Sequence, residues 1–200
     1  MPSVASLLLG LACGSIPFGY LAGRIKGTDI RTRGSGNIGF TNVYRVLGIG
    51  WAIPVLVLDV AKGFLPTAFA HSLGLAPSLV GTGAVLGHVF TPWLRFQGGK
   101  GVATTIGVTF LLCFRSILAG LGLYAVVLLA AGYVSVSSLS LAVALPLLTA
   151  LFYPRDPQLI IFTGIVGLVI IFRHTDNIRR LARGKEPKFG LWLKLFRKTQ

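Results

Sequence analysis

Long apolar stretches separated by short polar loops limit what this chain can fold into more than any other feature. Residues 102–133 contain a single charged residue, Arg115. About 20 apolar residues suffice to cross a lipid bilayer as a helix. Only 12% of the residues are charged, against about 25% in a soluble domain. The pattern therefore predicts an all-α integral membrane protein.

The apolar stretches predict about seven transmembrane helices, some of them short. The stretch 102–133 is too long for one helix, so we divide it at Arg115. The first stretch is interrupted by Gly14, Ser15, Pro17 and Gly19, and Pro17 is expected to kink the helix near the membrane surface. A five-helix arrangement, with two stretches only half inserted, stays open. The predicted spans are 3–23, 51–70, 78–94, the two parts of 102–133, 139–153 and 158–172. We expect one membrane domain over 1–200, whose basic tail 173–200 ends in an interfacial helix that turns Trp192, Leu193, Leu195 and Phe196 toward lipid.

The positive charge is concentrated on one side of this arrangement. The net charge is +14, and 16 of the 19 Lys and Arg residues lie in the loops 24–50 and 95–101 and in the tail. Positive loops stay in the cytoplasm, so these loops and the C-terminus are predicted to be cytoplasmic and the N-terminus outside. A small polar turn, 133–138, lies on the same side. Because the charge flanks apolar spans, we expect no nucleic-acid partner.

The stretch 31–45, RTRGSGNIGFTNVYR, is the most polar and glycine-rich part of the chain. It contains three arginines and no acid. Glycines let the backbone approach a ligand closely, and guanidinium groups with clustered N–H groups bind anions, phosphate above all. GSGNIG within it matches the dinucleotide-binding pattern G-x-G-x-x-G, but that site needs a soluble βαβ unit. Here an apolar span precedes the motif, and the acid 20 residues further on, Asp59, lies inside the next span.

A second glycine-rich loop, 95–101, holds the sequence GGKG around Lys100. It is not a P-loop, because the spacing is wrong and Gly101 stands where Ser or Thr is needed. Lys100 could be a boundary lysine that reaches for the membrane surface. With a similar loop on the same side, we favour a phosphate site.

Several other polar residues lie within or beside the predicted helices. Asp59 and Lys62 share a helix face and can form a structural ion pair, although a direct role in the site stays open. His88 and His174 stand at cytoplasmic helix ends, where each could bind phosphate, act as a base or be an ordinary interfacial histidine. No metal site is expected, since the few acids and histidines are scattered.

Six segments together resemble a known family. They are GSIPFGYL (14–21), RTRGSGNIGFTNVYR (31–45), LDVAKG (58–63), GHVFTPWLRFQGGKGVAT (87–104), GYVSVSS (132–138) and RHTDNIRRLARGKEP (173–187). They look like the bacterial membrane glycerol-3-phosphate acyltransferases that use acyl phosphate as donor, the PlsY family, over nearly the whole chain. The resemblance implies transfer of a fatty acyl group to the 1-hydroxyl of sn-glycerol 3-phosphate, giving lysophosphatidic acid and phosphate, as the first step of phospholipid synthesis. It implies a multi-pass protein of the bacterial inner membrane, whose active site faces the cytoplasm.

The resemblance and the loop chemistry together give the candidate site. We expect no cofactor, no covalent acyl-enzyme and a monomer. The proton of the acceptor would pass to a substrate phosphate, or else to His174. Glu186 is expected to order the Arg-rich tail by pairing, with a direct role left open. The candidate catalytic residues are Ser35, Asn37, Arg45, Lys100 and His174. Asn177 would help bind the two phosphates, backbone donors would come from Gly36, Gly98, Gly99 and Gly101, and the secondary candidates are Thr41, Asn42, His88, Ser135 and Ser138.

Two rival functions share the basic face and the membrane frame. A transporter of organic phosphate would be expected to show inverted repeats and broken helices at mid-membrane. This sequence shows no internal repeat, and its polar clusters lie at one surface. A lipid-binding scaffold would bind anionic lipid without forming a product.

Overall fold

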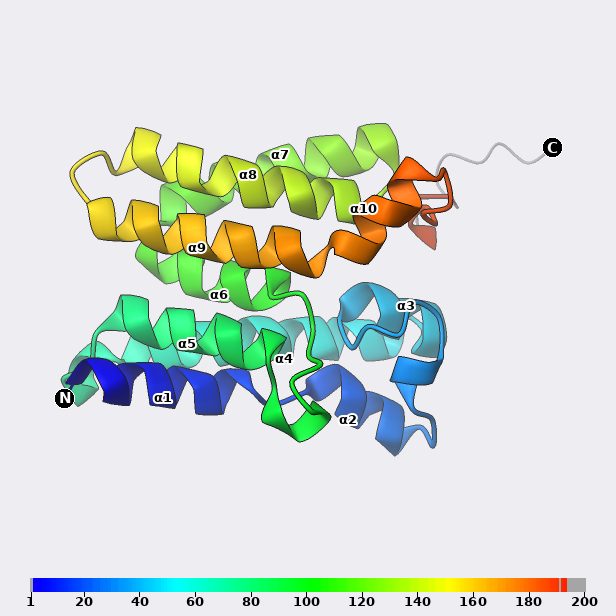
Figure 1. The fold of residues 1–200 in the computed structure, drawn as a ribbon, viewed down its shortest axis with the longest axis horizontal. Coiled ribbons are helices and arrows are strands. Elements are labelled where there is room, and N and C mark those ends of the chain that lie inside the picture. Colours follow the sequence, from blue (N-terminus) through cyan, green and yellow to red (C-terminus); the bar gives the residue numbers. More distant parts are fainter. Residues whose placement is uncertain (1, 191, 194–200) are drawn as a thin grey trace. The chain divides into compact units, whose positions relative to one another are not determined.

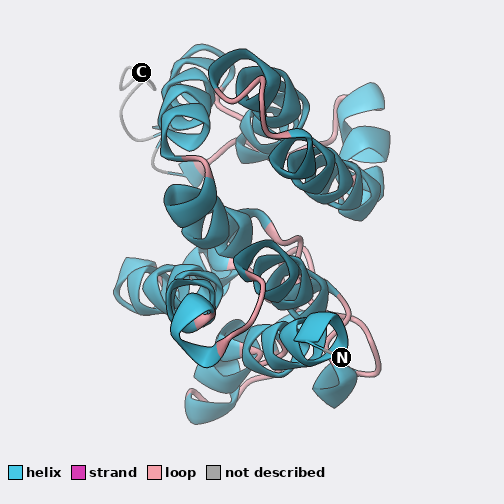
Figure 2. Ribbon diagram, turned by 90° about the vertical axis from the view of Figure 1, so that its left-hand side faces the viewer, coloured by secondary structure: helices cyan, strands magenta, loops and turns pink. Residues whose placement is uncertain are grey.

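The computed structural model describes residues 2–190 and 192–193, and every regular element in this part of the chain is a helix (Figures 1 and 2). The chain forms two compact units, residues 1–114 and 115–200. The expectation of a single domain over the whole chain stays a prediction.

Glycines bring the helices of the first unit into backbone contact. A β-carbon on Gly10 would overlap the Val80 carbonyl, and one on Gly83 would overlap the Leu7 carbonyl. The helices α1 and α5 can therefore lie side by side, as Figure 1 shows, at a distance that only small residues allow. The elements of this unit are α1 (Pro2–Gly14), α2 (Phe18–Ile25), η1 (Ile30–Thr32), α3 (Phe40–Leu47), α4 (Ile49–Phe69), η2 (His71–Leu73), α5 (Pro77–Val89), η3 (Pro92–Leu94) and α6 (Val102–Leu112).

A small apolar core holds the polar end of the first unit together. Its buried members come from α2, η1, α3 and α4, and aromatic side chains such as Phe18 and Trp51 pack around them. Because the core joins four elements, it fixes the loop between α2 and α3 on the side of α4. The buried members are Ala22, Ile30, Val43, Ala52 and Val55.

The second unit contains α7 (Phe114–Ala131), α8 (Val134–Phe152), α9 (Pro157–Arg173) and α10 (Thr175–Ala182). A β-carbon on Gly167 would meet the Ala142 carbonyl oxygen at 2.5 Å, so α8 and α9 also touch through a glycine. The helices α9 and α10 meet at an angle of 55°. His174 lies at this bend, as the last residue before α10.

The helices confirm an all-α membrane architecture but do not confirm the predicted count. Within the described residues, four segments are long and apolar enough to cross a bilayer, namely Ser3–Ile25, α4, α7 and α8. The bent pair α9 and α10 makes a fifth if it counts as one span. The helices α5 and α6 have only 13 and 11 residues. The number seven and the orientation of the termini stay predictions.

Two local predictions were wrong. The predicted loop 24–50 contains α3, because Phe40, Val43 and Leu47 recur at helical spacing and pack toward α4. The predicted turn 133–138 forms the start of α8, where the hydroxyls of Ser137 and Ser138 donate to the carbonyls of the preceding turn at 3.1 and 2.8 Å. The expected interruption of the first span is present, since α1 ends at Gly14 and α2 begins at Phe18, just after Pro17.

We predict that Gly83→Ala destabilises the first unit, because the new methyl group overlaps the backbone of α1. Overpacking of this kind costs about 1–3 kcal/mol. Thermal unfolding in detergent should show a lower melting temperature. Gly164→Ala, where a β-carbon meets nothing within 4 Å, is the matched control and should leave the melting temperature unchanged or slightly higher. Equal behaviour of the two variants would contradict the backbone contact.

Candidate active site

Asn42 holds the loop between α2 and α3 in shape. Its side-chain oxygen accepts from the Ser35 N–H at 2.8 Å. Its amide group donates to the carbonyls of Ile30, Arg33 and Asn37 at 3.1, 3.1 and 2.8 Å. The side chain is 1% exposed, so all of its hydrogen bonds go to this loop. Asn42 therefore holds the backbone of the loop from its buried side. Contact between Asn42 and a substrate stays a prediction.

Two glycines with positive φ turn the chain within this loop. Gly34 has φ 60° and Gly36 has φ 72°, a region that favours glycine. A β-carbon on Gly34 would overlap the Asn42 side-chain oxygen. The N–H of Gly36 donates to the Arg33 carbonyl at 3.0 Å. These glycines allow the tight turn that brings Ser35 to the surface.

The basic side chains of this loop fall into two groups. Arg31 pairs with Asp29 at 2.6 Å and lies over the Tyr20 ring at 4.8 Å. The hydrogen bond from Arg31 lowers the pKa of Asp29 to about 2. Arg33 and Arg45 are exposed and have no ion-pair partner among the described residues. Sequence reasoning overlooked Asp29, which stands two residues before the motif and neutralises its first arginine.

Other predicted residues of the loop lie at its surface or edge. Ser35 is exposed, while Asn37 and Thr41 are half-buried. The Asn37 side-chain oxygen accepts from the Gly39 N–H at 2.8 Å, so it supports the entry into α3. Arg45 stands in the last turn of α3, and its Cδ would meet a β-carbon on Gly34 at 3.4 Å. A cationic head thus lies beside the glycine turn, which suits an anion.

The GGKG loop is packed tightly against the end of α5. The N–H groups of Gly98 and Gly99 donate to the carbonyls of Val89 and His88, each at 3.0 Å. A β-carbon on Gly99 would overlap the His88 ring. The half-buried Lys100 follows at once. Gly101, with φ 86°, is the N-terminal cap residue of α6. The N–H groups of Gly36, Gly98 and Gly99 thus donate within the protein in this structure. Their place beside a substrate stays a prediction.

A buried charged group lies beneath the GGKG loop. Lys62 and Asp59 of α4 pair at 2.8 Å, and the ammonium group also donates to the Ile16 carbonyl at 2.7 Å. The nearer Asp59 oxygen is 3.6 Å from the His88 Nδ1 atom. All three side chains are less than 5% exposed. The contacts agree with the structural ion pair that the sequence suggested.

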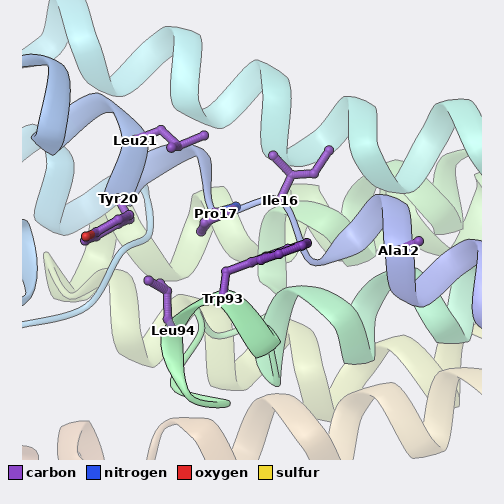
Figure 3. Close-up of a pocket in the computed structure, with 7 residues that line it drawn as sticks. All are labelled: Ala12, Ile16, Pro17, Tyr20, Leu21, Trp93 and Leu94. Atoms are coloured by element: carbon purple, nitrogen blue, oxygen red, sulfur yellow. The ribbon is translucent and has the colours of Figure 1, made fainter.

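A small apolar cavity of about 340 Å³ opens beside the break between α1 and α2. Figure 3 shows Trp93 close to Ile16 and Pro17, with Tyr20 at one end. The Trp93 indole N–H donates to the Ser15 hydroxyl at 2.9 Å. An apolar lining of this kind suits an alkyl chain.

In the second unit, Glu186 ties the tail to α10. It accepts from the Asn177 amide at 2.6 Å and from the Arg180 Nε–H at 2.7 Å. Burial raises the pKa of Glu186, but the hydrogen bonds from Asn177 and Arg180 outweigh this and lower it. The Ser135 hydroxyl lies near Glu186 without a standard hydrogen bond among the described residues. The predicted pairing of Glu186 with the Arg-rich tail is present.

His174 lies at the bend between α9 and α10 and is 2% exposed. Its Nδ1 atom is 2.8 Å from the Ile170 carbonyl oxygen. A carbonyl only accepts, so this nitrogen carries the proton and, in the neutral ring, Nε2 is the acceptor. That tautomer is compatible with a base, and the role itself stays a prediction.

The tail then packs on the turn between α7 and α8. The Phe189 N–H donates to the Gly132 carbonyl, and the Trp192 indole donates to the Leu129 carbonyl, both at 2.8 Å. Trp192 is half-buried against Gly132, and its predicted contact with lipid stays a prediction. Leu195 and Phe196 of the predicted interfacial helix lie outside the described residues.

Comparison with known proteins decides the family. The model of the family "Glycerol-3-phosphate acyltransferase" matches residues 4–184. The chain belongs to the glycerol-3-phosphate acyltransferase family. Proteins of that name from Geotalea daltonii and Geobacter sulfurreducens are each 44% identical, over 94% and 88% of this chain and 99% and 92% of their own.

Solved structures of PlsY, an integral membrane glycerol 3-phosphate acyltransferase, have the same fold. Its glycerol 3-phosphate form aligns with a TM-score of 0.89 at 35% identity, over 98% of this chain and 100% of that one. Its lysophosphatidic acid form gives 0.87 at 34% identity, with the same coverage. This member of the family is therefore an integral membrane acyltransferase of phospholipid synthesis.

The role of Asn42 as a loop clamp can be tested by Asn42→Asp. A carboxylate would replace the donating amide and face three carbonyl oxygens, which costs about 1–3 kcal/mol. Hydrogen exchange should become faster for the amides of residues 30–37. Asn37→Asp is the matched control, because it keeps the oxygen that accepts from the Gly39 N–H, and it should leave this exchange unchanged. Unchanged exchange in Asn42→Asp would exclude the clamp.

The lowered pKa of Glu186 predicts a pH-dependent contribution to stability. Its value in the fold lies below the ordinary 4.5, so the stabilisation is present above pH 4.5 and is lost as the pH falls through the folded pKa. Melting temperatures of the unmodified protein and Glu186→Gln should differ by a constant amount above about pH 5.5 and converge in more acidic buffer. A difference that persists at low pH would mean that the carboxylate charge is not the cause.

Proposed function

We propose that this chain transfers a fatty acyl group from acyl phosphate to the 1-hydroxyl of sn-glycerol 3-phosphate, forming lysophosphatidic acid and inorganic phosphate. The observation that carries the proposal is the exposed Arg45 beside a glycine turn that Asn42 holds in shape. A second loop with a cation, at Lys100, is packed on α5. Family membership and the likeness to PlsY in its glycerol 3-phosphate form support the acceptor.

The proposed reaction needs the two substrates to be held next to each other in the right orientation. The 1-hydroxyl oxygen attacks the acyl carbonyl carbon, and the bond from that carbon to the phosphate oxygen breaks. Acyl phosphate already has a good leaving group, so no acyl-enzyme is needed. Holding the two phosphorylated molecules in the right geometry supplies much of the rate. Arg45, Lys100, His174 and Asn177 would bind the two phosphates, helped by the polar groups of Ser35 and other loop residues.

The negative charge that develops on the acyl carbonyl oxygen must be stabilised, and the proton of the 1-hydroxyl must be accepted by a base. The N-terminus of α6, at Gly101, presents N–H groups that could stabilise the carbonyl oxygen as it becomes negative. The proton of the hydroxyl would pass to an oxygen of a substrate phosphate, which leaves no net change on the protein. The Nε2 atom of His174 is the alternative acceptor.

The membrane placement belongs to the same proposal. The short helices α5 and α6 would bring the number of transmembrane helices to about seven, with the polar loops and the C-terminus in the cytoplasm. In a bacterial inner membrane, this orientation gives the site access to soluble glycerol 3-phosphate and to the acyl donor. We propose that the enzyme acts as a monomer without a cofactor.

A product assay with the purified protein tests the function. Lysophosphatidic acid should form from glycerol 3-phosphate and acyl phosphate. Arg45→Ala and Lys100→Ala should each lower kcat/KM at least about 100-fold, because each removes a charged hydrogen bond to phosphate worth about 1.5–3 kcal/mol together with its positioning effect. Arg115→Ala, at an exposed arginine of the second unit, is the control and should keep full activity.

Two results would contradict the proposal. Product formation only with acyl-CoA would refute the donor. Uptake of glycerol 3-phosphate into vesicles without chemical change would instead identify a transporter.

A further inference from the structure

The buried group Asp59, Lys62 and His88 connects two parts of the first unit that are far apart in the sequence. Lys62 reaches the Ile16 carbonyl at the break between α1 and α2. His88 is the penultimate residue of α5. Asp59 lies between them, 2.8 Å from the ammonium group and 3.6 Å from the His88 ring. One carboxylate thus lies between Lys62, which is bonded to the break before α2, and the end of α5, which precedes the GGKG loop.

The His88 ring is also the surface on which the GGKG loop rests. The Gly99 backbone lies so close to the Nε2 side of the ring that no β-carbon fits between them. The His88 and Val89 carbonyls accept from the Gly99 and Gly98 N–H groups, each at 3.0 Å. A shift of the ring would therefore move the backbone immediately before Lys100.

The buried charges of Lys62 and Asp59 are well partnered within the protein. A charged pair within an apolar helix is costly to bury unless each charge is well partnered. The ammonium group of Lys62 is partnered by Asp59 and by a carbonyl, and it also lies over the Phe18 ring at 5.5 Å. The pair can thus hold a fixed position, and His88 approaches the same Asp59 oxygen that Lys62 contacts, with its Nδ1 atom 3.6 Å from Oδ1.

We propose that Asp59 and His88 are positioning residues, which hold the GGKG loop so that Lys100 meets a substrate phosphate. In this account His88 acts through the loop and is not itself a ligand, unlike its expected secondary role in binding. The proposal rests on the proposed function for its kinetic consequence. Its structural part, the fixed position of the loop, does not depend on that function.

Hydrogen exchange gives the first test. In Asp59→Asn the carboxylate charge is lost at nearly constant shape, and the amides of Gly98 and Gly99 should exchange at least about 10-fold faster. Exchange in α7 to α9 should not change. Asp156→Asn is the matched control, because Asp156 is an exposed helix cap and asparagine caps equally well. It should leave exchange of the GGKG loop unchanged.

A second variant covers the case in which Asp59→Asn fails to fold. His88→Asn keeps a donor near the Nδ1 position, toward Asp59, but removes the part of the ring that supports Gly99. It should fold and show the same faster exchange at Gly98 and Gly99. Unchanged exchange in either folded variant would overturn the positioning role, whatever the enzyme's activity.

Kinetics separate positioning from a general loss of folded protein. A merely structural role would reduce the active fraction, which lowers kcat and leaves KM unchanged. The proposal expects KM for one of the two phosphorylated substrates to rise at least about 10-fold in His88→Asn. An unchanged KM for both substrates, in a preparation that still forms product, would also overturn it. Absence of product in the unmodified protein would instead count against the proposed function and leave the exchange result valid.

Discussion

The structure of the first unit depends on how two backbone carbonyls are satisfied where α1 ends. A helix that breaks inside an apolar frame exposes carbonyls that lipid cannot hydrogen-bond, and each such group costs several kcal/mol if it is left alone. The Thr91 hydroxyl donates to the Ser15 carbonyl at 2.6 Å, and Lys62 donates to the Ile16 carbonyl at 2.7 Å. The partners come from the segment after α5 and from α4. The break between α1 and α2 is thus bonded both to α4 and to the segment after α5. These bonds fix where α2 begins, and with it the loop between α2 and α3.

The use of an ammonium group to hydrogen-bond the Ile16 carbonyl has a further consequence for the site. The buried charge of Lys62 needs an anion, and Asp59 supplies it from the same helix face. Asp59 in turn lies 3.6 Å from His88, against whose ring the GGKG loop packs. The loop beside Arg45 is held in shape by an uncharged residue, Asn42, and Arg45, unlike Arg31, has no carboxylate partner among the described residues. Catalysis of this kind calls for cations that are held by neutral or distant groups, since a neighbouring carboxylate would compete with phosphate for them.

The helical membrane frame could be predicted from the sequence because apolar runs of about 20 residues have few alternatives. The glycine-rich loops stood out for a similar reason, since their composition contrasts with the rest. Asn42 looked like a surface ligand, because composition does not tell that its amide faces three carbonyls. Ser137 and Ser138 looked like a turn, because serine favours turns unless its hydroxyl bonds the preceding helical turn, as it does here. Such errors arise where a polar side chain serves its own backbone, which only the three-dimensional arrangement reveals.

The central claim is that a phosphorylated substrate binds where the arginine of α3 and the lysine of the GGKG loop present their charges. A crystal structure of the protein with glycerol 3-phosphate bound would test this most directly. The account predicts that an oxygen of the substrate's phosphate lies within hydrogen-bond distance, about 2.7–3.2 Å, of the side chain of Arg45 or Lys100. A phosphate held elsewhere, with both side chains turned away from it, would contradict the account.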